Sequence, residues 1–179
     1  MEESSSGFRD RLYDSELESV YRRHGRRIYS LCLRLLADVR VAEEATSDVF
    51  AQFGRDWARW KDEPQTQLRL REMAIDVALA RLGKEHGKAE TLASLCVCAS
   101  TSRSGLVLAR LEPAVLDVII AQLPSTERAA YVLRYVEGMS DAAVAIRLRV
   151  TKAAIRRLLH KARLQLRELW LVQQAGRII

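Results

Sequence analysis

Apolar side chains recur every three or four residues along most of this chain, and that spacing predicts α-helices. The most regular stretch runs from Leu123 to Trp170. Its pattern predicts a short helix over residues 141–148, a turn at 149–151 and a longer helix that follows the turn. One side of the longer helix is apolar and carries Ile155, Leu158, Leu159, Ala162, Leu166 and Leu169. This arrangement predicts a helix-turn-helix, whose second helix enters the major groove of DNA.

Hydroxyl side chains stand where both of these helices should begin. Ser140 follows a break at Gly138-Met139, and Thr151 ends the predicted turn. A serine or threonine oxygen accepts a hydrogen bond from a backbone N–H at a helix start, so both residues are expected N-caps. Asp141 then lies in the first turn, where the helix dipole favours an acid. The apolar residues of the short helix are Val144, Ile146 and Leu148.

The other side of the longer helix is basic. From Ala142 to Arg167 the chain has eight Lys or Arg and no Asp or Glu. A basic face on a bundle helix often serves only to keep the helix in water, but such faces usually mix acids and bases. The absence of acids favours a partner of dense negative charge, with nucleic acid first. The basic side carries Lys152, Arg156, Arg157, Lys161, Arg163 and Arg167.

Three helices are expected in the amino-terminal half. A capping-box spacing at residues 15–18 predicts the start of the first helix, after a mobile tail over residues 1–14. The second helix is expected from Val41 to about Trp60, and the third from Leu68 to Leu82, ended by Gly83. The predicted core positions of the three helices are Leu17, Tyr21, His24, Ile28, Leu31 and Leu35, then Val41, Ala45, Val49, Phe53, Trp57 and Trp60, then Leu68, Leu70, Met73, Val77 and Leu82.

A stretch rich in Gly, Ser and Thr separates the two halves. We expect a helical domain over residues 15–84, a flexible linker over 85–110, a helix-turn-helix domain over 111–170 and a tail over 171–179. Pro113 suits the first position of a helix. Another helix is expected from Ser125 to Val136, with Ala129, Val132, Leu133 and Val136 packed under the basic helix.

Composition agrees with an all-α protein of two small domains. The chain has 179 residues, 49% of them hydrophobic, with three prolines and eight glycines. No apolar run approaches the roughly 18 residues that cross a bilayer, and the first ten residues do not form a secretory signal, so membrane insertion is not expected. Three cysteines are too few for a disulfide framework, which favours a reducing cytoplasm. The net charge of +6 suits nucleic acid or an anionic membrane.

The sequence offers few groups for chemistry. His24, His86 and His160 are scattered, and no carboxylate pair or glycine-rich phosphate loop is present, so neither an enzyme nor a cofactor is expected. His24 is interpreted as a packed histidine, because no other ligand residue stands at metal-binding spacing beside it. Cys96 and Cys98 form a C-x-C pair that can bind a metal or act as a redox switch, but incidental cysteines in a loop are the preferred interpretation.

The residues taken together resemble the extracytoplasmic-function (ECF) sigma factors of bacterial RNA polymerase, over roughly Glu16 to Trp170. The carboxyl half resembles sigma region four in Leu123-Pro124, Tyr131–Tyr135, Glu137–Ser140, His160–Arg163 and Leu166–Leu169. The amino half resembles sigma region two in Tyr21–His24, Ala42–Thr46 and Val49-Phe50. Either half alone would be a weaker signal than the two together.

The resemblance implies partners and roles. Region two would dock on the clamp helices of the β′ subunit of core RNA polymerase through Glu43, Glu44 and Asp48, although the helix dipole alone would also account for acids near a helix start. Region four would read the minus-thirty-five element of promoter DNA. An anti-sigma factor is a further partner that the family implies. The promoter-reading residues would be Thr151, Lys152, Arg156, Arg157, His160, Lys161 and Arg163.

The third helix departs from the family pattern. The segment that reads and melts the minus-ten element usually contains Trp, Arg and Asn where this chain has Arg69, Ile75 and Asp76. An acid at Asp76 would repel phosphate. Arg69, Arg71, Arg81 and Lys84 would still hold a DNA strand electrostatically. Arg149 replaces a turn glycine, at a cost of about 1 kcal/mol if the turn needs a left-handed residue.

Two alternatives to a functional ECF sigma factor stay open at this point. One is a sigma-derived regulator that binds polymerase or DNA but has lost promoter melting. The other is a stand-alone helix-turn-helix repressor that binds DNA without polymerase.

Overall fold

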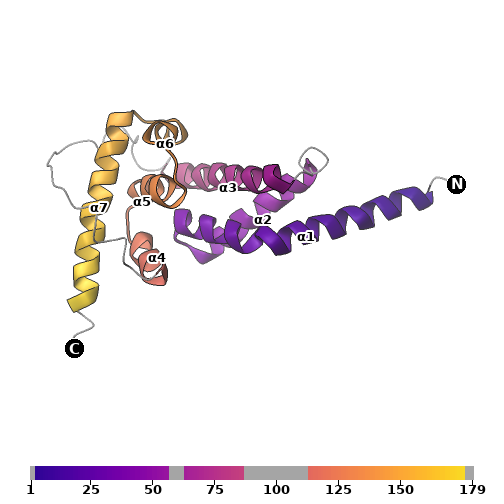
Figure 1. Ribbon diagram of the computed structural model, residues 1–179, viewed down its shortest axis with the longest axis horizontal. Coiled ribbons are helices and arrows are strands. Elements are labelled where there is room, and N and C mark those ends of the chain that lie inside the picture. Colours follow the sequence, from indigo (N-terminus) through magenta and orange to yellow (C-terminus); the bar gives the residue numbers. More distant parts are fainter. Residues whose placement is uncertain (1–2, 57–62, 87–112, 176–179) are drawn as a thin grey trace. The chain divides into compact units, whose positions relative to one another are not determined.

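The protein folds as two helical units. The computed structural model describes the backbone of residues 3–56, 63–86 and 113–175, and all regular elements in these ranges are helices (Figure 1). The first unit holds residues 1–33 and 38–78, and the second holds 34–37 and 79–179. The all-α prediction is confirmed. The predicted linker, with Cys96 and Cys98, falls almost wholly outside the described residues.

Three helices build most of the first unit: α1 (Glu3–Leu36), α2 (Val39–Arg55) and α3 (Glu63–His86). The last residues of α1, from Arg34 on, and of α3, from Leu79 on, belong to the second unit. Asp38 caps α2, since its side chain accepts a 2.8 Å hydrogen bond from the backbone N–H of Val41. Asp38, expected only as part of a break, therefore fixes where α2 begins. The buried side chains of this unit include Ile28, Leu31, Ala45, Val49, Phe53, Leu70 and Ala74.

Helix boundaries in the first unit differ from those expected. Helix α1 begins at Glu3 rather than at Ser15, so residues 3–14, expected to lie before the first helix, are helical. Helix α2 ends at Arg55, and Trp57 and Trp60 lie outside the described residues. Helix α3 runs through Gly83 to His86, because one glycine costs a helix only about 1 kcal/mol and does not stop it. Pro64, expected in a loop, lies in the first turn of α3, where proline is tolerated.

Two predicted core residues lie at the surface. The exposed fraction is 53% for both Tyr21 and Leu68. Helical spacing assigns a residue to a face, but it does not say how far around the helix the neighbouring elements reach. His24 is buried, as expected for a packed histidine.

The second unit is built around α7 (Lys152–Ala175), which packs against α4 (Pro113–Ala121), α5 (Ser125–Tyr131) and α6 (Asp141–Leu148) (Figure 1). Helix α4 begins at Pro113, as predicted. Helix α7 continues to Ala175, so residues 171–175 extend this helix beyond the expected domain end at residue 170. The buried residues of this unit include Ile119, Ile120, Ala129, Val132, Leu133, Val144, Ile155, Leu159, Ala162 and Leu166.

The helix expected over residues 125–136 changes its hydrogen bonding half-way. After α5 it becomes the π-helical segment η3 (Val132–Val136). The backbone N–H of Glu137 donates to the carbonyl of Val132 at 2.9 Å, and that of Met139 donates to Leu133 at 3.0 Å. Gly138, with φ of +69°, turns the chain at this point. Val136, a predicted core residue, is 36% exposed as a result of this ending.

A buried arginine joins helix ends in the second unit. Arg128 is 7% exposed, and its guanidinium donates to the carbonyls of Ala121, Leu123, Leu35 and Leu36 at 2.9–3.2 Å. The last carbonyls of a helix have no partner within the helix, so they need donors from elsewhere. Arg128 supplies these donors for the end of α4 and the end of α1.

A second arginine in the second unit links the same two helices, α1 and α4. Arg34 makes a two-pronged pair with Asp117, at 2.7 Å from Nε and 3.0 Å from Nη2. The hydrogen bond to Asp117 raises the pKa of Arg34 above its ordinary value, although partial burial acts in the opposite direction, so the Arg34 guanidinium stays charged.

We expect the second unit to depend on the fork geometry of Arg128. Replacing Arg128 with Met leaves three buried carbonyls and one part-buried carbonyl without a donor. It should lower the free energy of unfolding by about 3 kcal/mol. Arg128→Lys keeps the charge, but one ammonium group cannot serve carbonyls at two helix ends. It should therefore recover less than half of the loss. Urea unfolding of the full chain, followed by circular dichroism, measures both variants. Wild-type stability in Arg128→Lys would show that charge alone is sufficient.

The turn between α6 and α7 contains a left-handed residue. Arg149 has φ of 54° and ψ of 41°, so the conformational cost expected from the sequence is present. Arg149→Gly should raise the free energy of unfolding by about 1 kcal/mol. Gly138→Ala is a matched control with the opposite sign, because Gly138 has φ of +69° and no neighbouring atom within 4 Å of an added Cβ. It should lower the same free energy by about 1 kcal/mol. Thermal unfolding of the two variants checks the pair, and equal signs would contradict it.

Candidate functional site

Both helices of the helix-turn-helix in the second unit begin at the residues predicted from the sequence. The Ser140 hydroxyl accepts from the N–H of Ala143, and the Thr151 hydroxyl accepts from the N–H of Ala154, each at 3.2 Å. Val144 on α6 and Ile155 on α7 are fully buried. Ile146 was expected among the apolar contacts, but it is 77% exposed. The two caps set the start of α7, and with it the side chains that its first turns present.

Exposed polar residues lie along the first turns of α7. Of the seven residues named for promoter reading, the exposed ones are Thr151, Lys152, Arg156, Arg157 and Lys161. The other two are only partly accessible. Arg163 Nε donates to the carbonyl of Leu159 on its own helix at 3.2 Å. His160 Nε2 is buried and has no hydrogen-bond partner among the described residues. The open part of the face therefore lies at the amino-terminal end of α7.

Acids from other helices contact this face. Lys161 Nζ lies 3.3 Å from Oε1 of Glu127 on α5, and Glu127 is only 5% exposed. Asp141 pairs with Arg134 at 2.8 Å and lies 4.0 Å from Arg156. Lys161 is thus partly neutralised and ties α5 to α7. Sequence reasoning missed Glu127 and Arg134, because no residue spacing along the chain shows a contact between α5 and α7 or between η3 and α6.

The first unit presents an acidic face on α2. Glu43, Glu44 and Asp48 are all exposed, and Arg40 lies 3.6 Å from Glu44. The first turn of α2 contains no acid, so the helix dipole does not account for this cluster. The structure therefore removes the simpler of the two explanations that the sequence allowed.

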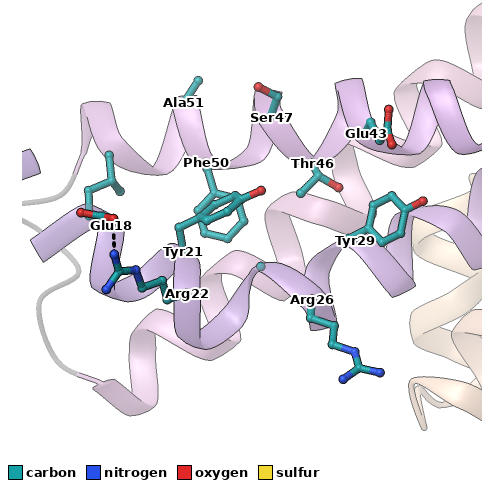
Figure 2. Close-up of a pocket in the computed structure, with 12 residues that line it drawn as sticks. Glu18, Tyr21, Arg22, Arg26, Tyr29, Glu43, Thr46, Ser47, Phe50 and Ala51 are labelled. Atoms are coloured by element: carbon teal, nitrogen blue, oxygen red, sulfur yellow. Dashed lines mark hydrogen bonds and ion pairs between the residues drawn. The ribbon is translucent and has the colours of Figure 1, made fainter. Parts of the chain in front are cut away.

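A groove of about 1010 Å³ runs beside this acidic face, between α1 and α2 (Figure 2). The rings of Tyr21 and Phe50 meet edge to face at a centroid distance of 4.8 Å and form its apolar floor. Arg22 on α1 pairs with Glu18 at 2.6 Å, while Glu43 lines the groove from α2. The exposed tyrosine belongs to this groove, which explains why Tyr21 does not enter the core.

Comparisons with known proteins agree with this architecture. Residues 114–166 match the family described as "Sigma-70, region 4". The fold matches the sigma factor RpoE of Bartonella quintana, solved in complex with the anti-sigma factor NepR, with a TM-score of 0.53 and 15% sequence identity. The match covers 89% of this chain and 97% of that one. No curated protein gives a significant match. The sequence match lies on the helix-turn-helix, and the fold match extends over both units.

Residues 114–166 of this chain therefore form a sigma-70 region 4 domain, and the chain shares the fold of a sigma factor. The family match agrees with the resemblance of the carboxyl half to sigma region four, and the fold match agrees with the two-domain helical architecture expected for both halves. Among the described residues, no group of side chains has the make-up of a metal site. None of the helices in the described ranges is both long and apolar enough to pass through a membrane.

The third helix, α3, keeps the departures from the family pattern that its sequence showed. Ile75 is 2% exposed and belongs to the core, while Asp76 is exposed on α3. Arg69 lies 3.7 Å from Glu72 on the same helix. Arg69, Arg71 and Arg81 are half-buried, and the Lys84 side chain lies outside the described residues. The residues expected to hold a DNA strand here are therefore less open than those of α7.

Proposed function

We propose that this sigma factor directs promoter-specific initiation by reading the minus-thirty-five element with the first turns of α7. The observation that carries the proposal is the exposed set Thr151, Lys152, Arg156 and Arg157, placed by the Thr151 cap directly after the turn. In a helix-turn-helix this end of the second helix contacts base edges. The basic residues further along α7 would contact phosphates and set the register of the protein on the duplex.

Within this proposal, α2 docks the protein on core RNA polymerase. Glu43, Glu44 and Asp48 form an exposed acidic face that has no structural role at the helix start. The neighbouring groove has an aromatic floor and a charged rim, which suits a helix that brings both apolar and charged side chains. The β′ clamp helices are the proposed partner. The polymerase supplies the chemistry of RNA synthesis, and the sigma factor would work with it in the cytoplasm.

An anti-sigma factor is a further proposed partner. The RpoE chain that shares this fold was solved with the anti-sigma factor NepR. We propose that a protein inhibitor of this kind also controls the present sigma factor, by covering the surfaces that polymerase and promoter need.

A second candidate function rests on α3. With Ile75 buried and Asp76 exposed, the helix lacks the basic and amide side chains that the family uses to melt the minus-ten element. A sigma factor with this helix would bind polymerase and the minus-thirty-five element but open few promoters.

Charge reversal on α2 tests polymerase docking. Glu43→Lys together with Glu44→Lys places two cations where we expect a basic partner, and such like-charge contacts cost several kcal/mol. We expect the affinity for core RNA polymerase to fall about a hundredfold or more, with loss of co-elution on gel filtration. Glu168→Lys, a reversal at an exposed acid on α7, should leave co-elution intact. Unchanged co-elution of the double variant would count against this docking face.

Permanganate footprinting separates a full sigma factor from one that has lost melting. A promoter first has to be selected, by recovering the DNA fragments that the wild-type holoenzyme retains. On that promoter, reactive thymines around the minus-ten element are expected if α3 still melts DNA. Retention of the fragment with no reactive thymines would favour the second candidate. Binding of palindromic DNA without polymerase would instead support an independent helix-turn-helix repressor.

A further inference from the structure

Asp141 contacts two arginines in the second unit. Its Oδ1 accepts a 2.8 Å hydrogen bond from Nε of Arg134, and its Oδ2 lies 4.0 Å from Nε of Arg156. The side chain of Asp141 is 26% exposed, against 37% for Arg134 and 69% for Arg156. The carboxylate is therefore the most enclosed of the three groups, and it is shared between η3 and the amino-terminal part of α7.

A second contact fixes the position of Arg134. The guanidinium carbon of Arg134 lies 5.5 Å from the centroid of the Tyr135 ring, within cation–π range. The Tyr135 ring in turn lies 5.0 Å from that of Tyr131. Arg134 is thus held by an acid and a ring together, and its pair with Asp141 is formed before any DNA arrives.

The helix dipole alone does not account for where the Asp141 side chain points. An acid in the first turn of α6 stabilises the helix whether or not it meets an arginine. Here the carboxylate reaches cations of η3 and α7, and it is the single acidic residue between Gly138 and Arg167. A phosphate that approaches Arg134 or Arg156 must compete with this carboxylate and is repelled by its charge.

We propose that Asp141 lowers the affinity of the sigma factor for DNA of arbitrary sequence, by competing with phosphates for Arg134 and Arg156. The inference rests on the proposed DNA-binding role of α7. Sequence-independent affinity comes almost entirely from phosphate contacts, whereas contacts to base edges carry specificity. An acid that weakens phosphate contacts therefore increases the difference in affinity between the promoter and other DNA.

The test compares the full-length protein with Asp141→Asn. Asn keeps the size of the side chain and an acceptor oxygen for Arg134, and it replaces the other carboxylate oxygen by an uncharged NH2 group. Fluorescence anisotropy with a short duplex of random sequence, over a series of salt concentrations, gives the affinity and its salt dependence. We expect Asp141→Asn to bind about three- to tenfold more tightly at low salt. The slope of log K against log salt should steepen by about 0.9 for each additional phosphate that the variant neutralises.

Two further variants make the result specific. Glu168→Gln changes the net charge equally at an exposed acid on α7, and it should produce less than half of the increase in affinity. In an Arg134→Gln background, most of the increase caused by Asp141→Asn should disappear, because the arginine that it frees is absent. Thermal unfolding confirms that each variant is folded.

The outcomes separate the inference from the function on which it rests. If the affinity of Asp141→Asn rises no more than that of Glu168→Gln, or falls below that of wild type, the inference is overturned and the DNA-binding role of α7 stands. If folded wild-type protein does not bind the duplex at any salt concentration, the DNA-binding role itself is overturned, and the inference with it.

Discussion

The second unit depends on the hydrogen bonds of one buried guanidinium group. Arg128 serves carbonyls at the ends of α4 and α1 within this unit, and it does so from the middle of α5. The same short segment carries Glu127, which reaches Lys161 on α7, and η3 after it carries Arg134, which reaches Asp141 on α6. Residues 127–134 therefore position both helices of the helix-turn-helix. A buried charge costs free energy unless it is fully hydrogen-bonded, so this arrangement tolerates little change around Arg128.

Local signals in the sequence predicted the helix-turn-helix well. The Ser140 and Thr151 caps, the left-handed turn at Arg149 and the buried side of α7 all depend on residues a few positions apart, and each is present. Other helix ends were predicted poorly, because the local signals there were weak. A capping-box spacing did not start α1, and Gly83 did not stop α3, because both are weak preferences that the surrounding helix overrides.

The candidate site could be predicted only in part, for a physical reason. Periodicity placed the basic residues on one side of α7, but it could not show which of them meet acids from other helices. Lys161 is tied to the buried Glu127, Arg163 turns back to its own helix, and His160 is half-buried. Such contacts depend on how α5 packs on α7, which only the tertiary structure determines. For the acidic face of α2, the structure instead strengthened the sequence interpretation. Helix α2 starts at Val39, so its acids lie beyond the first turn, where the helix dipole does not account for them.

Two of the exposed large apolar side chains lie on the proposed partner surfaces. Tyr21, at 53% exposure, forms the floor of the groove beside the acidic face of α2, and Ile146, at 77%, lies on the first helix of the helix-turn-helix. Exposing a large apolar side chain forgoes about 1.5–3 kcal/mol of burial free energy. A partner that covers such a side chain recovers part of that free energy on binding. The exposed tyrosine and the acids of α2 together therefore suit a partner surface that is both basic and apolar. Such a surface can cover the ring and pair with the acids at the same time, whereas water leaves the ring uncovered.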